Sequence, residues 1–165
     1  MTAASRPGGQ ATIRPLADDA EVARCAHLRA TSEPWLTLGL GYEASLALLK
    51  DPSRENYVAA VGNDVAGFIV LAMTGAFVGY IQTVCVAPKH RGNGLGSQLI
   101  GFAEERIFRE TPNVFICVSS FNRRAHELYL RLGYRQVGEL TDFIVSGHSE
   151  LLLRKSLGQL RGFRR

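Results

Sequence analysis

The chain has 165 residues, of which 46% are hydrophobic and 21% charged, so it fits one globular domain with a real core and leaves little room for two. The net charge of +4 comes from the last twelve residues, which hold five Lys or Arg and no acid; the rest of the chain carries 4 − 5 = −1. We therefore do not expect a basic face for nucleic acid, a disulfide framework built on the three cysteines, or a membrane span of ~20 apolar residues. The sequence predicts a cytoplasmic protein.

The first half of the chain is predicted to hold a strand, two helices and three more strands. Asp18 or Asp19 is expected to cap the first helix, and Pro52 follows the second. Gly62-Asn63-Asp64 is typical of a hairpin turn. The strands are predicted at residues 11–16, 57–61, 65–73 and 77–87, and the helices at residues 19–30 and 42–49, with a loop at 31–41.

The second half alternates helices and strands. An apolar stripe at i+4 spacing predicts a helix over residues 95–109, and Asn122 and Gly133 are the expected ends of another helix. Short strands are predicted at residues 114–118, 134–140 and 151–153. The order β-α-α-β-β-β-α-β-α-β-β predicts an α/β (α+β) domain.

The sharpest motif lies between the strand ending near Pro88 and the helix starting at Leu95. It is rich in glycine and carries three cationic side chains in the run Lys89-His90-Arg91. Glycines allow close backbone approach, and the positive end of a helix dipole favours an anion. The motif therefore predicts a pyrophosphate-binding turn.

The residue spacing of this motif shows which class of phosphate-binding site it resembles. It lacks the lysine of a Walker loop, and Ser97 replaces the third glycine of a dinucleotide-binding fingerprint. Arg91-x-x-Gly94-x-Gly96 instead resembles the acetyl-CoA signature of the GNAT superfamily, [QR]-x-x-G-x-[GA]. A second segment beginning at Asn122, N-x-x-A-x-x-L-Y-x-x-L-G-Y, resembles a later part of the same fold, and together the two motifs extend the resemblance over about residues 11–155.

The resemblance implies the GNAT fold and direct acetyl transfer from acetyl-CoA to an amine, without a metal. The fold would have a mixed sheet of about seven strands, with the fourth and fifth splayed apart, and about four helices. The pantetheine arm would pair with one splayed strand, and a main-chain amide there would polarise the thioester carbonyl. The implied cofactor-binding residues are Val84, Cys85, Val86, Arg91, Gly92, Asn93, Gly94, Leu95, Gly96, Ser97, Asn122 and Tyr129.

Two residues of the second segment have both a family role and a structural alternative. Tyr129 matches the tyrosine that protonates the leaving thiolate, although it also lies on an apolar helical stripe. Asn122 matches a position that contacts the cofactor arm and is also a suitable helix N-cap. Both roles of Asn122 can hold together.

The acceptor half departs from its nearest resemblance, the ribosomal-protein N-terminal acetyltransferase branch. That branch has a glutamate where this chain has Cys117, and tyrosines where it has Phe143 and Ile144. An acetyl-cysteine intermediate at Cys117 is not expected, because cysteine in an apolar strand usually behaves as a small hydrophobe. The candidate general bases are Glu33, Asp142, His148 and Glu150.

The acceptor predictions rest on the loop between the first two helices. Trp35 either packs at the core edge or offers a face to an ammonium or an apolar amine substituent, and Glu33 offers a countercharge. The acceptor is expected to be a small-molecule amine; a protein N-terminus or lysine, and a non-catalytic acyl-CoA sensor, stay as alternatives. The expected layout is a frayed arm (1–10), the acetyltransferase domain (11–155) and a basic tail (156–165), in a monomer or homodimer.

Overall fold

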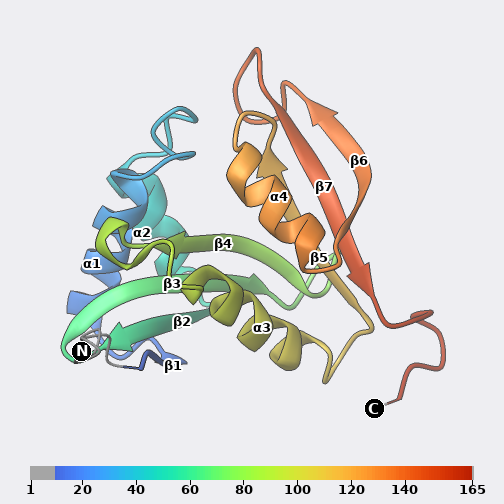
Figure 1. Cartoon of the computed structure of the whole chain (residues 1–165), viewed down its shortest axis with the longest axis horizontal. Coiled ribbons are helices and arrows are strands. Elements are labelled where there is room, and N and C mark those ends of the chain that lie inside the picture. The colour runs from blue at the N-terminus through green and yellow to red at the C-terminus, as the bar shows by residue number, and fades with distance from the viewer. Residues whose placement is uncertain (1–9, 165) are drawn as a thin grey trace, which may run out of the picture.

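The computed structural model describes residues 10–164 as one seven-stranded sheet with helices on both faces (Figure 1). The elements follow the predicted order. The strands are β1 (Thr12–Pro15), β2 (Arg54–Val61), β3 (Asp64–Ala72), β4 (Tyr80–Val86), β5 (Asn113–Ser119), β6 (Arg135–Thr141) and β7 (Ser149–Ser156). The helices are α1 (Asp19–Ala30), α2 (Tyr42–Lys50), α3 (Leu95–Ile107) and α4 (Arg123–Arg131), with a short 3-10 turn at Pro88–His90.

The helix ends follow the local signals in the sequence. The Asp18 carboxylate accepts a hydrogen bond from the Glu21 amide at 2.9 Å, and the Asn122 side chain accepts one from the Ala125 amide at 3.3 Å. Both are N-caps, as predicted. Gly133 follows α4 with φ 93°, the left-handed conformation predicted for it.

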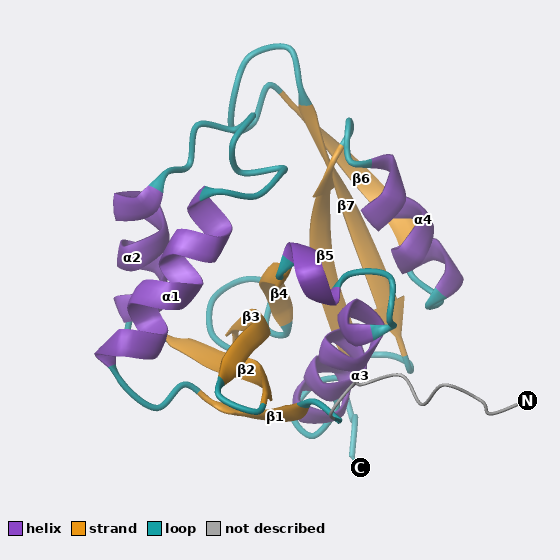
Figure 2. Ribbon diagram, turned by 60° about the vertical axis from the view of Figure 1, so that its left-hand side comes forward, coloured by secondary structure: helices purple, strands orange, loops and turns teal. Residues whose placement is uncertain are grey.

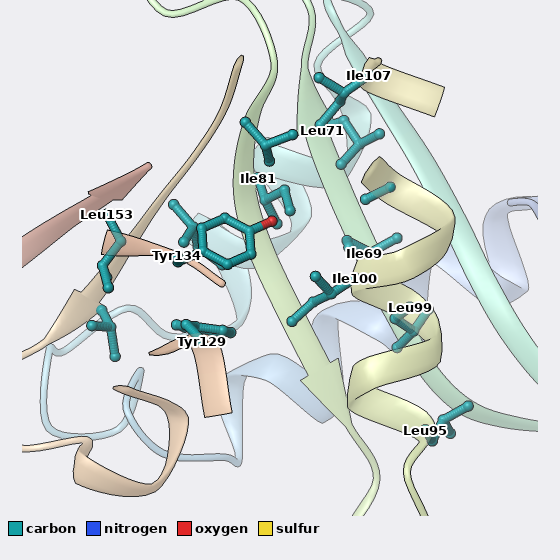
Figure 3. Close-up of a cluster of buried hydrophobic side chains, with 14 of the residues drawn as sticks. Ile69, Leu71, Ile81, Leu95, Leu99, Ile100, Ile107, Tyr129, Tyr134 and Leu153 are labelled. Carbon is teal, nitrogen blue, oxygen red and sulfur yellow. The ribbon is translucent and has the colours of Figure 1, made fainter. Parts of the chain in front are cut away.

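The helices lie on opposite faces of the sheet. Helices α1 and α2 pack on one face around Phe68, Val70 and Cys85, whereas α3 and α4 cover the other (Figure 2). The predicted stripe on α3 is buried in the larger cluster, between the helix and the sheet (Figure 3). Its members Leu95, Leu99, Ala103 and Ile107 are at most 6% exposed.

The sheet divides at its centre. Its order is β1-β2-β3-β4-β5-β7-β6, antiparallel except for the parallel pair β4 and β5. That pair is joined only at Tyr80–Phe115 and Ile81–Ile116, after which the strands diverge. This confirms the predicted α/β (α+β) fold of about seven strands, with the fourth and fifth splayed.

Three predicted boundaries need correction. The strand predicted over residues 57–61 begins already at Arg54, because its pairing with β3 starts at Arg54–Ala72. The strand predicted over residues 77–87 begins only at Tyr80, because Gly79 has φ 86° and its amide closes a turn onto the Ala72 carbonyl at 3.1 Å. A Cβ atom on Gly79 would lie 2.6 Å from the Asn113 carbonyl oxygen, so only glycine fits there. The last strand is longer than the predicted 151–153, because its pairing with β5 runs through Ser156.

The predicted division into arm, domain and tail stays a prediction. Apart from Gln10, the arm lies outside the described residues, as does Arg165. Two of the five terminal cations belong to β7, where Lys155 pairs with Glu104 at 2.7 Å and Arg154 donates to Asn113 at 2.7 Å. The longest helix of residues 10–164 has 13 residues, and none there has the length and hydropathy of a membrane span.

Candidate active site

A cavity of about 450 Å³ opens where β4 ends and α3 begins. It is bounded by the glycine turn, the N-terminus of α3 and one face of α4. Every predicted cofactor-binding residue except Asn93 lines it, and Glu33 and Trp35 line it as well. The residues that line it are Glu33, Trp35, Val84, Cys85, Val86, His90, Arg91, Gly92, Gly94, Leu95, Gly96, Ser97, Asn122, Arg124, Ala125, Leu128, Tyr129 and Arg131.

The glycine turn leaves the first amides of α3 open to a ligand. Gly92 and Gly94 have φ 77° and 79°, and a Cβ atom built on either would meet no other atom within 4 Å. Gly94 is the N-cap of α3 and has no side chain to bond the first-turn amides. Free amides at the positive end of a helix, beside open space, suit an anionic group such as a pyrophosphate.

The cations of the turn are largely engaged with the protein. The Arg91 side chain donates from Nε to the Val86 carbonyl at 2.9 Å and from Nη2 to the Ser32 hydroxyl at 3.4 Å. Lys89 pairs with Asp64 at 2.6 Å. Arg91 therefore holds the turn against β4, and it occupies the Val86 carbonyl that the prediction left to the cofactor arm.

Sequence reasoning missed two further cations of this cavity, Arg124 and Arg131 on α4. They lie seven residues apart and flank Leu128, so helical periodicity places all three on one face. That spacing was the signal available in the sequence. Both arginines are exposed, so they can meet a phosphate-bearing ligand without a burial cost.

A second cavity, of about 270 Å³, lies beside the first. Six residues line both cavities, so the two meet where β4 leaves β5. The shared residues are Glu33, Trp35, Val84, Asn122, Ala125 and Tyr129. The second cavity is also lined by Cys117, Phe143 and Ile144, the positions at which the sequence departs from its resemblance.

Tyr129 is the polar side chain of α4 that reaches the junction of the two cavities. It is 8% exposed, and burial raises the pKa of its hydroxyl to about 12. The hydroxyl therefore stays protonated throughout the neutral range, as a proton donor requires. Its ring also packs 6.1 Å from the ring of Tyr134, so its core role and its position at the junction coexist.

The structure separates the four candidate bases. Asp142 and His148 line neither cavity: Asp142 accepts a hydrogen bond from the Gly147 amide, and His148 packs against Phe121. Glu33 lines both cavities at a loop, where its carboxylate accepts a hydrogen bond from the Thr37 amide at 3.2 Å.

Glu150 is the buried carboxylate of the second cavity. It is 6% exposed, and the Ser119 hydroxyl donates to it at 2.5 Å. Burial raises the pKa of Glu150, and this hydrogen bond opposes the rise. A raised carboxylate pKa brings the group closer to the operating range of a general base.

Cys117 faces the second cavity as a thiol. Burial raises its pKa, and a hydrogen bond from Tyr80 opposes the rise. Burial also raises the pKa of Tyr80, so its hydroxyl keeps its proton. Since only the thiolate is a strong nucleophile, this environment does not activate Cys117.

Trp35 combines the two roles considered for it. It is 9% exposed and belongs to the smaller hydrophobic cluster, yet it lines both cavities. The guanidinium carbon of Arg29 lies 5.2 Å from its ring centroid. This cation thus already occupies the position over the ring at which an acceptor ammonium was expected.

Acetyl-CoA fits the residues that line the first cavity. The open amides of α3 suit its pyrophosphate, and the edge of β4 that faces β5, unpaired beyond Ile81, suits its amide-bearing arm. Within residues 10–164, no group of three or more His, Cys, Asp or Glu is arranged to hold a metal ion.

A family model and curated relatives assign the chain to the same kind of protein. Residues 20–134 match the model of the acetyltransferase (GNAT) family. Over 96 residues, 54% of this chain, the sequence is 35% identical to the aminoalkylphosphonate N-acetyltransferase of Salmonella typhimurium. The match spans 62% of that protein, and the matches to two other curated relatives span 42% and 54% of theirs.

Solved structures share the fold at low sequence identity. An aminoglycoside 6'-N-acetyltransferase complexed with coenzyme A has a TM-score of 0.72 at 15% identity, over 90% of this chain and 98% of that one. The ribosomal-protein-S18-alanine N-acetyltransferase of Escherichia coli has a TM-score of 0.71 at 16% identity, over 94% of this chain and 99% of that one. At such identities the likeness extends to the fold alone.

Proposed function

The chain belongs to the acetyltransferase (GNAT) family, and from this premise we propose that it transfers the acetyl group of acetyl-CoA to the primary amine of a small molecule. The amine attacks directly, with both substrates bound. The observation that carries the proposal is the pair of cavities that meet at Tyr129, one at the open amides of α3 and one at Glu150.

The first cavity is the proposed site of acetyl-CoA. The amides that follow Gly94 bind the pyrophosphate, and Arg124 and Arg131 supply positive charge nearby. The unpaired edge of β4 around Val84 takes the arm, and a main-chain amide there donates to the thioester oxygen. Arg91 acts by holding the turn rather than by free charge.

Two groups of this chain move protons in the proposed reaction. Acetyl-CoA supplies a thioester, whose C–S bond breaks as the C–N bond to the amine forms. Glu150 accepts the proton that the acceptor ammonium loses, directly or through a water. Tyr129 donates its hydroxyl proton to the departing sulfur. The nitrogen loses its second proton to solvent as the amide forms, and solvent returns one proton to the Tyr129 oxygen, so the protons balance.

A small acceptor is favoured over a protein. The second cavity is about 270 Å³, the lower end of the size range of small-molecule sites, and Trp35, Phe143 and Ile144 bound it. The Salmonella relative carries a name that specifies N-acetylation of a small amine. The replacement of a glutamate by Cys117 removes from β5 the carboxylate of the N-terminal acetyltransferase branch.

The experiment is an acceptor screen with the purified chain and acetyl-CoA, in which free thiol is measured as product. Thiol release with small primary amines, and none with ribosomal N-terminal peptides, is the expected result. A peptide that is acetylated faster than every small amine would favour the protein-acetyltransferase alternative. A rise in melting temperature with acetyl-CoA, without thiol release from any acceptor, would make the chain an acyl-CoA sensor.

A further inference from the structure

A buried arginine lines the second cavity, and the proposed chemistry does not use it. Arg29 is in the last turn of α1, is 7% exposed and lines this cavity. It follows Val22, Cys25 and Ala26 at positions i, i+3, i+4 and i+7, the buried face of the helix. An arginine at such a position brings a positive charge into the protein interior.

The charge of Arg29 has no counter-ion in the described part of the chain. Its Nη1 donates to the Ser45 hydroxyl at 2.9 Å, and its guanidinium lies over the ring of Trp35. Its buried Nε has no hydrogen-bond partner, and none of the ion pairs among residues 10–164 includes it. Burial accordingly lowers its pKa to about 10, which leaves it charged at neutral pH.

A second unpaired polar group lies on the same cavity. Thr83 on β4 is 3% exposed, and its buried hydroxyl has no partner among the described residues. Buried polar groups are almost always hydrogen-bonded, and an unpaired buried charge is costly. The Arg29 guanidinium and the Thr83 hydroxyl thus line the same cavity with unused hydrogen-bonding capacity. This indicates that a bound ligand supplies the polar group that they bond.

We propose that the second cavity takes an amine that also carries an acidic group, with Arg29 as the anchor of that group. The proposal rests on the proposed function and names its substrate class. Carboxylate and phosphonate oxygens both match the fork of a guanidinium, and Thr83 can donate a further hydrogen bond. The amine then points to the junction with the first cavity, where Tyr129 lies.

The cavity is lined by charges of both signs, which suit such a zwitterion. Glu33 and Glu150 also line the cavity and attract the ammonium, whereas Arg29 attracts the anion. A polyamine would place a second cation against Arg29, which is unfavourable in a buried site. The cavity therefore selects zwitterionic amines over dicationic ones.

The test compares acceptors that differ at the end away from the amine. They are 2-aminoethylphosphonate, β-alanine, n-propylamine and spermidine, and each is assayed with the native chain, Arg29→Gln and Arg29→Lys. The native chain should acetylate an anionic amine with a lower KM than n-propylamine. Arg29→Gln should raise that KM about 10- to 100-fold, the usual loss for a charged hydrogen bond, with little change for n-propylamine. Arg29→Lys should recover part of the loss.

Several outcomes would overturn the anchor. These are a preference of the native chain for spermidine or n-propylamine, or an equal KM change for charged and uncharged acceptors in Arg29→Gln. The comparison of the two anionic probes shows whether the site prefers phosphonate or carboxylate. Thr83→Val, which keeps the shape and removes the hydroxyl, provides a second variant if Arg29→Gln does not fold, and it should raise the KM of the anionic acceptors selectively.

A binding measurement separates this proposal from the proposed function. If no amine is acetylated although acetyl-CoA binds, acetyl transfer fails, and titration with 2-aminoethylphosphonate then tests the anchor alone. Binding to the native chain that Arg29→Gln or Thr83→Val weakens supports the anchor. Equal binding to native chain and variants, or no binding to any, rejects it.

Discussion

The replacement Tyr129→Phe tests the junction of the two cavities with a change of one atom. The ring stays packed beside Tyr134, and the hydroxyl environment is dominated by burial rather than by a hydrogen bond. The folded state therefore loses little, and the melting temperature should hardly change. If the hydroxyl protonates the leaving sulfur, kcat should fall ~10²-fold, about 2.7 kcal/mol of barrier, with the Kd of acetyl-CoA nearly unchanged.

Tyr134→Phe is the matched control. Tyr134 is 2% exposed, its ring is 6.1 Å from that of Tyr129, and it lines neither cavity. Burial and the neighbouring Glu104 carboxylate raise the pKa of the Tyr134 hydroxyl, so the control removes a protonated phenol hydroxyl from the same cluster but outside both cavities. The control should keep the native kcat.

The assay is steady-state thiol release at saturating acetyl-CoA, with binding followed by calorimetry. Because the pKa of Tyr129 is about 12, its donor form persists to pH 10, and the native kcat should not decline between pH 8 and 10 through loss of this proton. Equal kcat values for native chain and Tyr129→Phe would refute the role of the hydroxyl. A similar loss in Tyr134→Phe would show that packing, not proton donation, is responsible.

Three further predictions address the other parts of the site. Glu150→Gln should lower kcat/KM ~10²-fold or more and remove the part of its rise with pH that comes from Glu150; the rise that remains comes from deprotonation of the acceptor ammonium. Because the pKa of Glu150 is raised, its basic form appears at higher pH than that of an ordinary carboxylate. An unchanged pH profile would move the base to Glu33. Gly94→Val should abolish the rise in melting temperature with acetyl-CoA, because valine is strained at φ 79° and fills the turn, and a full rise would contradict the assigned cradle. Cys117→Ala should retain most turnover, whereas an acetylated Cys117 found by mass spectrometry without acceptor would establish a covalent mechanism instead.

Local signals in the sequence predicted most of the fold. Apolar periodicity identified α3, and the caps at Asp18, Asn122 and Gly133 depend on neighbours within a few residues. The boundary at residue 77 was wrong because Gly79 is required by a contact with Asn113, 34 residues later in the chain (113 − 79). Contacts between distant segments leave no periodic pattern in one sequence.

The two halves of the site differed in predictability for the same reason. The proposed cofactor half comes from two short continuous motifs, so its residues could be named from the sequence, and all but Asn93 line the first cavity. The acceptor half combines side chains of α1, β4, β5 and β7, which only the sheet topology brings together. The choice of Glu150 over Asp142 required the structure, although the place of Arg29 on a buried helical stripe was visible as periodicity.

The divergence of β4 and β5 leaves few backbone pairings between the two halves of the sheet, so local unfolding should start there. Two residue pairs join these strands, against seven between β5 and β7. The amides of β4 and β5 that face the gap beyond Ile81 and Ile116 should exchange with deuterium through local opening, well before global unfolding. Bound acetyl-CoA would lie in the gap between β4 and β5 and contact both halves of the sheet, so its binding should slow amide exchange on both strands. The cosubstrate would thus act as a missing strand that makes the sheet a single cooperative unit.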